Sequence, residues 1–172
     1  MRTLFLLRHG DASPTAPGSS DHDRVLASAG RRDVEWVGPR IAAHEVRPTL
    51  LLSSSARRAV ETLEALRSSL SAAADIQIER RLYLADADSL FESIREADVL
   101  HAGLLVIGHN PGIGWLAHAL ARPGVGAARL ERSFPAGSLA ILSFACDCWR
   151  DVAPGQGVLV EFTRPPTSFA AR

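Results

Sequence analysis

The chain of 172 residues contains no lysine, because all 19 of its Lys and Arg positions are arginine. It therefore cannot form a Schiff base through a lysine amine, and it has no GxxxxGK[ST] phosphate-binding loop. The 19 acidic residues bring the formal net charge to zero. A neutral chain has no long-range field to attract nucleic acid or an anionic membrane, so we expect neither as a partner.

Cysteine and long apolar runs are also scarce. Cys146 and Cys148 form one C-x-C pair, and two thiols without further Cys or a nearby His cannot complete a tetrahedral zinc site. We interpret both as reduced, half-buried residues of an intracellular protein. No apolar stretch approaches the ~20 residues of a membrane helix, and the first apolar run stops at Arg8, too early for a signal peptide. We therefore expect a cytoplasmic protein.

The composition is that of a soluble globular protein, with 47% hydrophobic and 22% charged residues. The length fits one domain with a substantial core, and no repeat, linker or low-complexity segment suggests a second domain. We expect one domain over residues 1–172, with a frayed tail from about residue 164. We also expect a monomer.

Two buried strands are predicted to end in histidine. The apolar run from Leu4 to Leu7 is followed by Arg8-His9-Gly10-Asp11, and the run from Gly103 to Ile107 is followed by Gly108-His109-Asn110-Pro111. Short apolar runs bounded by glycine and proline favour buried strands over helices. In a parallel sheet the carboxyl ends of the strands share one edge, where ligands bind, so we expect His9 and His109 to converge there.

The remaining pattern predicts alternating helices and strands. Apolar residues at helical spacing predict four helices, near residues 28–41, 55–70, 90–98 and 114–121. Ser28 is the expected N-cap of the first helix, and Ser54 or Ser55 that of the second. Four further apolar or alternating stretches predict strands at 49–52, 76–78, 138–144 and 157–162. No helix is evident between the last two, so we expect an antiparallel edge on a mainly parallel sheet, in a three-layer α/β/α sandwich.

Arg57 and Arg58 fall in the first turn of the second predicted helix. Arginine there opposes the helix dipole, at a cost of up to ~1 kcal/mol, unless an anion is bound. Guanidinium and backbone N–H groups converging at a helix N-terminus make a good phosphate site. Two histidines and an arginine pair without an acidic cluster suit a phosphoryl group better than a metal, so we expect no metal and no cofactor.

Four blocks of the sequence, between residue 3 and about residue 116, carry a resemblance to a known family. They are Arg8-His9-Gly10, Asp23-Arg24-Val25-Leu26 with Gly30, Arg58 to Thr62, and Gly108 to Gly112. In this order they resemble the histidine phosphatase superfamily, whose fold is phosphoglycerate mutase-like. The short length and the opening from Arg8 to Ala12 are similar to its small SixA-type phosphohistidine phosphatases.

The resemblance implies a single histidine phosphatase domain that acts through a phosphohistidine intermediate. His9 would be the nucleophile, while Arg8, Arg58 and His109 would bind the phosphate oxygens. The implied substrate is a phosphohistidine on a partner protein. Two alternatives are a broad-specificity phosphomonoesterase acting on small metabolites and a catalytically degenerate module that only binds a phosphoprotein.

Many members of the superfamily use an acidic proton donor, which no motif identifies here. Asp86, Asp88 and Asp11 are the candidates. Of the other histidines, His22 lies in the polar loop near the expected site and is a weaker candidate for substrate contact. We expect structural or surface roles for the other three histidines, which are His44, His101 and His118.

Overall fold

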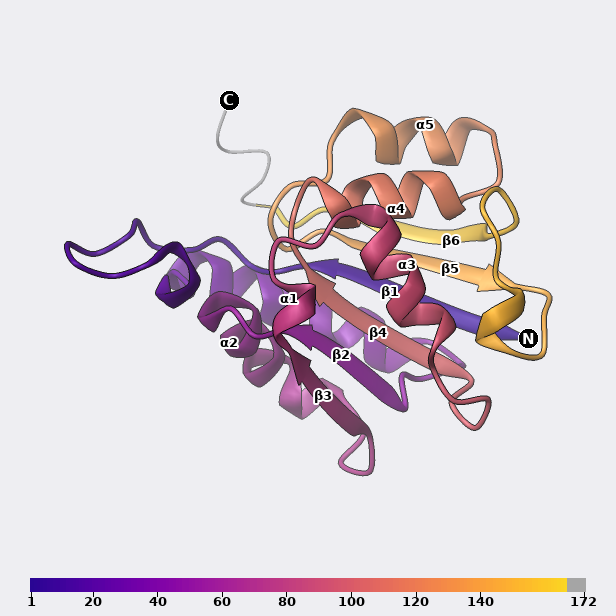
Figure 1. The fold of residues 1–172 in the computed structure, drawn as a ribbon, viewed down its shortest axis with the longest axis horizontal. Helices are drawn as coiled ribbons and strands as arrows, with labels where there is room; N and C mark the ends of the chain where they lie inside the picture. The colour runs from indigo at the N-terminus through magenta and orange to yellow at the C-terminus, as the bar shows by residue number, and fades with distance from the viewer. Residues whose placement is uncertain (167–172) are drawn as a thin grey trace.

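The computed structural model describes residues 1–166, apart from the side chains of residues 125, 131 and 132, and is built on a six-stranded mixed sheet (Figure 1). The strands are β1 (Arg2–Arg8), β2 (Leu50–Ser54), β3 (Asp75–Glu79), β4 (Gly103–Gly108), β5 (Leu139–Phe144) and β6 (Val158–Thr163). Their order across the sheet is β3-β2-β4-β1-β5-β6. Strands β1 to β4 pair in parallel, whereas β5 and β6 are antiparallel, which confirms the predicted edge.

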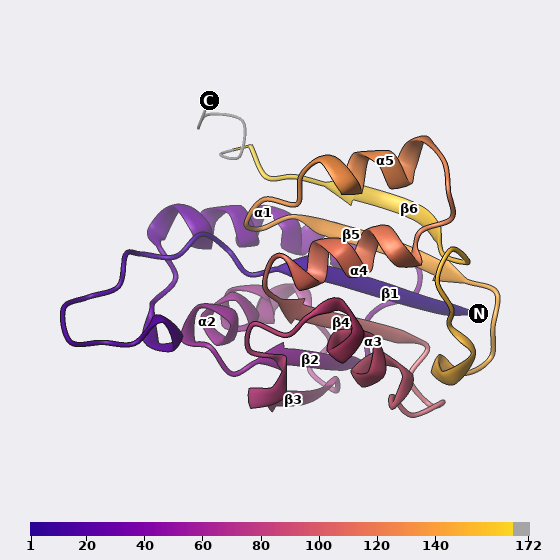
Figure 2. The same ribbon diagram turned by 45° about the horizontal axis from the view of Figure 1, so that its top comes forward.

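Helices cover both faces of the sheet and complete the three-layer α/β/α sandwich (Figures 1 and 2). On one face lie α1 (Ser28–Ala43) and α2 (Arg57–Leu66). On the other lie α3 (Ala87–Arg95), α4 (Gly112–Leu120) and α5 (Val125–Arg132). Short 3-10 turns occur at Asp21–Asp23, Arg67–Ser69, Arg80–Leu82 and Trp149–Asp151.

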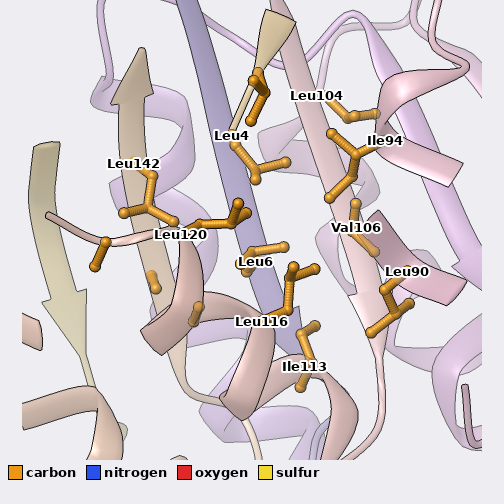
Figure 3. Close-up of a cluster of buried hydrophobic side chains, with 14 of the residues drawn as sticks. Leu4, Leu6, Leu90, Ile94, Leu104, Val106, Ile113, Leu116, Leu120 and Leu142 are labelled. Atoms are coloured by element: carbon orange, nitrogen blue, oxygen red, sulfur yellow. The ribbon is translucent and has the colours of Figure 1, made fainter. Parts of the chain in front are cut away.

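The central strand β1 is apolar at successive positions because both of its faces are buried. Leu4 and Leu6 pack in the cluster under α3 and α4 (Figure 3), whereas Phe5 and Leu7 pack against α1 and α2. Side chains alternate between the two faces of a strand, so the central positions of a strand covered on both faces are all apolar. Full burial of each such side chain contributes about 1.5–3 kcal/mol to stability.

The structure differs from the sequence-based prediction at several helix boundaries. Helix α5 was not predicted, because Gly124 and Gly126 at its start indicate a loop. The expected N-cap at Ser28 is wrong: Ala27 holds that position, and Ser28 is the first helical residue. The expected serine cap of α2 is also wrong, because Ala56 is the N-cap, and Ser54 Oγ accepts a hydrogen bond from the Ala56 N–H instead.

Several other predictions concern the ends and the surface of the chain. Residues 167–172 of the expected frayed tail lie outside the described residues. Cys146 and Cys148 are half-buried, as predicted, and the Cys148 thiol donates to Asp151 Oδ2 at 3.0 Å. Among residues 1–166, none of the helices combines the length and the apolar character needed to cross a membrane.

The carboxyl ends of β1, β2 and β4 lie side by side at one edge of the sheet. The loop that follows β1, drawn in indigo, extends beyond this edge at the left of Figures 1 and 2 before the chain enters α1. Residues far apart in sequence thus meet at this edge.

Candidate active site

His9 follows directly after β1 and is buried, with 8% of its surface exposed. Its Nδ1 lies 2.7 Å from the carbonyl oxygen of Gly10, and its Nε2 accepts a hydrogen bond from Arg58 Nε at 3.2 Å. A carbonyl oxygen can only accept, so Nδ1 carries the proton and Nε2 keeps its lone pair. His9 therefore has the tautomer of an Nε2 nucleophile.

Gly10 fixes the end of β1 against α2. Its N–H donates to Thr62 Oγ1 at 3.0 Å, and the Thr62 hydroxyl donates to the carbonyl of Arg58 at 2.7 Å. A Cβ at Gly10 would lie 2.7 Å from the carbonyl oxygen of Gly30, closer than real contacts allow. Glycine is thus required where the loop after β1 passes α1, while the hydrogen bond from Gly10 to Thr62 holds the residue after His9 against α2.

Arg58, in the first turn of α2, points into the site and is only 3% exposed. Its Nη1 donates to the backbone oxygen of Asp21 at 2.6 Å, and its Nη2 lies 3.1 Å from Asp21 Oδ2 and 3.3 Å from His109 Nδ1. Arg57 instead is exposed and pairs with Glu61 Oε1 at 2.9 Å. Of the two arginines, Arg58 is therefore the one that the fold brings to the histidines.

His109 follows β4 and lies against His9, with 4.9 Å between the ring centroids. Its Nδ1 faces Arg58 Nη2, which can only donate, so the proton is on Nε2 and is donated to Ser54 Oγ at 2.7 Å. Ser54 ends β2. The carboxyl ends of the parallel strands β1, β2 and β4 thus supply one cluster. The sequence predicts this for the two strands that histidine follows, β1 and β4.

Arg8, the last residue of β1, is held by a backbone carbonyl and not by the histidines or Asp21. Its Nη1 donates to the carbonyl oxygen of Phe134 at 3.1 Å, and the side-chain amide of Asn110 donates to the same oxygen at 2.8 Å. Arg8 Nε is buried and has no hydrogen-bond partner among the described residues. Arg8 and Asn110 therefore form one wall of the site together.

Asp21 is the main site residue that sequence reasoning missed. Its carboxylate accepts hydrogen bonds from the Tyr83 hydroxyl at 2.8 Å and from Arg24 Nη1 and Arg58 Nη2, both at 3.1 Å. The hydrogen bond from Tyr83, followed by those from the arginines, lowers the pKa of Asp21 to about 2. The carboxylate is thus ionised at neutral pH and holds the Arg58 guanidinium in place. An Asp three residues before Arg24 was the only signal in the sequence.

These side chains line an open cavity of about 340 Å³. The cavity is polar, and its titratable lining residues are Arg8, His9, Asp11, Asp21, Arg24, Arg58 and His109. Leu84 is the large apolar residue at the cavity, and its φ of 51° lies in the left-handed region, which is uncommon for leucine. Three arginines around two histidines make this cavity suitable for a tetrahedral oxyanion.

Two of the three candidate proton donors lie outside this cavity, which corrects their proposed role. Asp86 is the N-cap of α3, where its Oδ1 accepts from the Ser89 N–H at 2.8 Å, and this bond lowers the pKa of Asp86. Asp86 and Asp88 are both exposed and do not line the cavity. Asp11 does line it.

Of the remaining four histidines, His22 is the weaker candidate for substrate contact, and the other three are expected to have structural or surface roles. His22 lies beside the site, with Nε2 2.9 Å from Ser55 Oγ, but it is not part of the cavity lining. The other three lie away from His9 and His109: His44 contacts Val46, His101 contacts Thr49, and His118 contacts Ala127.

Both site histidines are expected to stay neutral far below the usual imidazole range. Burial disfavours the charged ring and, together with the neighbouring arginines, lowers the pKa of His9 to about 4; burial and the adjacent His9 lower that of His109 to about 3. Ring resonances of both residues, followed by NMR and assigned with His9→Ala, should therefore keep their neutral positions down to about pH 5. A midpoint near the ordinary value of 6.5 for His9 would contradict the buried, arginine-flanked site.

The same shift makes the fold sensitive to acid. Between pH 6.5 and about 4 the unfolded chain binds protons at these positions and the native chain does not. The free energy of unfolding therefore falls as the pH is lowered through this window, and it is restored as the pH rises above the unfolded pKa.

Comparison with known proteins gives matches over most of the chain. The model of the histidine phosphatase superfamily (branch 1) matches residues 4–89. An uncharacterized protein of Mycobacterium tuberculosis (strain H37Rv) is 35% identical over 163 residues, which are 92% of this chain and 99% of that protein. A solved candidate SixA phosphohistidine phosphatase from Nakamurella multipartitia superimposes with a TM-score of 0.85 and 27% identity, covering 96% of both chains. Its counterpart from Agrobacterium tumefaciens superimposes with a TM-score of 0.81 and 29% identity, covering 95% of this chain and 98% of that one.

Proposed function

Because this chain belongs to the histidine phosphatase superfamily and resembles its SixA-type members, we propose that it hydrolyses phosphohistidine on a partner protein, through a phosphoryl group carried transiently on His9. The observation that carries this proposal is the His9 ring in the cavity, whose Nε2 keeps a lone pair facing Arg58, beside an Asp21 carboxylate that is ionised at neutral pH.

The first step transfers the phosphoryl group to the enzyme. His9 Nε2 attacks phosphorus in line, the P–N bond to the substrate imidazole breaks, and its electron pair stays on that imidazole nitrogen. His9 Nδ1 keeps its proton throughout, and the hydrogen bond to the Gly10 carbonyl stabilises the positive charge that develops on the phosphorylated ring. In the second step water attacks phosphorus, the P–Nε2 bond breaks, and inorganic phosphate and a proton are released.

Arg8, Arg58 and His109 are proposed to bind the phosphate oxygens. Phosphoryl transfer needs positioning and neutralisation of charge on three oxygens rather than elaborate covalent chemistry, and arginines supply this without a metal ion. Arg58 already touches both histidines through Nε and Nη2. A bound phosphoryl group raises the pKa of the adjacent His109, so that Nδ1 can take up a proton and donate to an oxygen.

The ionised Asp21 carboxylate favours phosphohistidine over a phosphate ester as the substrate. An alkoxide leaving group needs a proton donor, commonly worth 10²–10⁴-fold in rate. Asp21, with its pKa lowered to about 2, is ionised and is committed to Arg58, Arg24 and Tyr83. A phosphohistidine already protonated on its other nitrogen leaves as neutral imidazole and needs no such donor.

The proposal predicts a substrate preference that can be measured. The value of kcat/KM for a protein phosphorylated on histidine should exceed that for each member of a panel of phosphate monoesters by tenfold or more, and EDTA should leave both unchanged. A tenfold preference for any monoester, about 1.4 kcal/mol of transition-state binding, would overturn the assignment.

A small-molecule phosphomonoesterase remains the second candidate function, because Asp11 lines the cavity. In that case Asp11 would be the proton donor. A collapse of ester hydrolysis in Asp11→Asn, with hydrolysis of phosphohistidine retained, would identify that role.

A further inference from the structure

A second hollow lies beside the phosphate cavity, between α4 and α5. It measures about 330 Å³, and its apolar lining includes Pro111, Trp115, Leu130 and Phe134. Of the side chains that the structure describes, the lining includes neither a carboxylate nor an arginine. We call this hollow the α4–α5 groove. Its chemistry contrasts with that of the polar cavity next to it.

Trp115 is an exposed aromatic residue of the α4–α5 groove. Its neighbours on α4, Ile113 and Leu116, point into the cluster between the helix and the sheet (Figure 3). One residue of an α-helix turns about 100°, so Trp115 falls outside that buried stripe, and 68% of its surface is exposed. A large exposed aromatic side chain of this kind is typical of binding surfaces, where tryptophan is enriched at the positions that contribute most.

The α4–α5 groove is continuous with the phosphate cavity. Asn110 lines both hollows, and the carbonyl oxygen of Phe134, a groove residue, accepts the hydrogen bonds of both Asn110 and Arg8. A molecule whose phosphoryl group reaches His9 thus has its adjoining parts at the mouth of the groove. Leu84 adds a further apolar side chain at the phosphate cavity, with 55% of its surface exposed.

We propose that the α4–α5 groove docks the protein that carries the phosphohistidine, by binding apolar side chains that lie beside the phosphorylated residue. This inference rests on the proposed function and adds how the substrate is selected. The polar cavity accommodates the phosphoryl group and its imidazole but offers little apolar contact. The groove offers that contact, and only a substrate with side chains next to its phosphohistidine can use it.

The test compares two substrates with the same chemistry at phosphorus. One is a histidine-phosphotransfer domain phosphorylated with phosphoramidate and bearing apolar side chains beside its phosphohistidine; the other is free phosphohistidine. Trp115→Ala should lower kcat/KM for the domain about tenfold or more, mainly through KM, and change kcat/KM for free phosphohistidine less than twofold. Trp115→Phe, which keeps an aromatic ring, should retain most of the kcat/KM that Trp115→Ala loses. Leu100→Ala, at an apolar residue that is exposed far from the groove, is the matched control and should change neither value.

The substrate supplies a second arm of the test. Replacing the apolar side chains of the phosphotransfer domain with serine should weaken turnover by the unaltered enzyme and remove most of the effect of Trp115→Ala. Equal losses on both substrates, or a loss on neither, would overturn the docking role. Failure of the proposed function would look different, because the unaltered enzyme would then turn over neither phosphohistidine substrate.

Discussion

Replacing His9 with alanine is expected to lower kcat/KM by at least about 10³-fold, for phosphohistidine and for any phosphate ester alike. Removal of a nucleophile that forms a covalent intermediate leaves only the contribution of substrate binding and charge stabilisation. His9 holds the Nε2 lone pair in the cluster, whereas His109 Nε2 carries a proton that is donated to Ser54. Rapid acid-free quenching with radiolabelled substrate should trap phosphate on the unaltered chain and none on His9→Ala.

His9 is buried, so its replacement has to be separated from a loss of folding. His9→Gln keeps much of the side-chain volume and should be equally inactive, with circular dichroism and urea midpoint close to those of the unaltered protein. His44→Ala removes a histidine that contacts Val46 outside the site and should retain activity. Full activity of a folded His9 variant would contradict the mechanism. If the unaltered protein binds phosphate but is inactive and traps no phosphate, it is instead a degenerate binding module.

Arg58→Ala is expected to lower kcat/KM about 10²–10³-fold, the usual effect of removing a preorganised group that stabilises transition-state charge. The neighbouring Arg57→Ala should change it less than about twofold. Successive helical residues point about 100° apart, and only Arg58 reaches His9, His109 and Asp21. Phosphate affinity, measured as competitive inhibition by inorganic phosphate, should fall in step in Arg58→Ala alone.

Arg57 provides a matched control because its loss changes only the surface. Its ion pair with Glu61 is exposed, and such pairs contribute about 0–1 kcal/mol to stability. Glu61 stays anchored without it, since Oε2 also accepts from the Leu26 N–H at 2.6 Å. Arg58→Lys should recover only part of the activity, because an ammonium group cannot copy the planar fork that contacts His9, His109 and Asp21 simultaneously. The reverse pattern, with Arg57 essential and Arg58 dispensable, would show that the register is wrong.

The strands and the two histidines could be predicted because their signals are local. A buried strand such as Leu4 to Leu7 has an unbroken apolar run, and the residue after it must lie at the edge of the sheet. His9 and His109 follow from this rule. The first helical turn predicts Arg57 and Arg58 alike, and the family resemblance selects Arg58. These predictions needed no knowledge of distant contacts.

The partners of these residues could not be predicted, because they depend on tertiary contacts. Asp21 reaches Arg58 only because the loop after β1 folds back over α2, and Tyr83 meets Asp21 from a turn 62 residues later. Asp86 had the right composition and region for an acid, but helix capping uses its carboxylate. A polar residue in a loop has the same sequence signal whether it caps a helix, fills a cavity or faces solvent.

The position of β1 has a consequence for how the chain reaches this structure. β1 precedes the other five strands of this sheet in the chain, yet it pairs with β4 and β5, at Gly103–Gly108 and Leu139–Phe144. At ribosomal rates of about 5–20 residues per second, roughly 7 to 27 s pass before β5 emerges. Throughout that interval the edge of β1 that pairs with β5 has no partner, and its other edge has none until β4 is made, the state in which nascent chains aggregate or bind chaperones. This strand at the centre of the native core therefore waits for most of translation before both of its edges are covered.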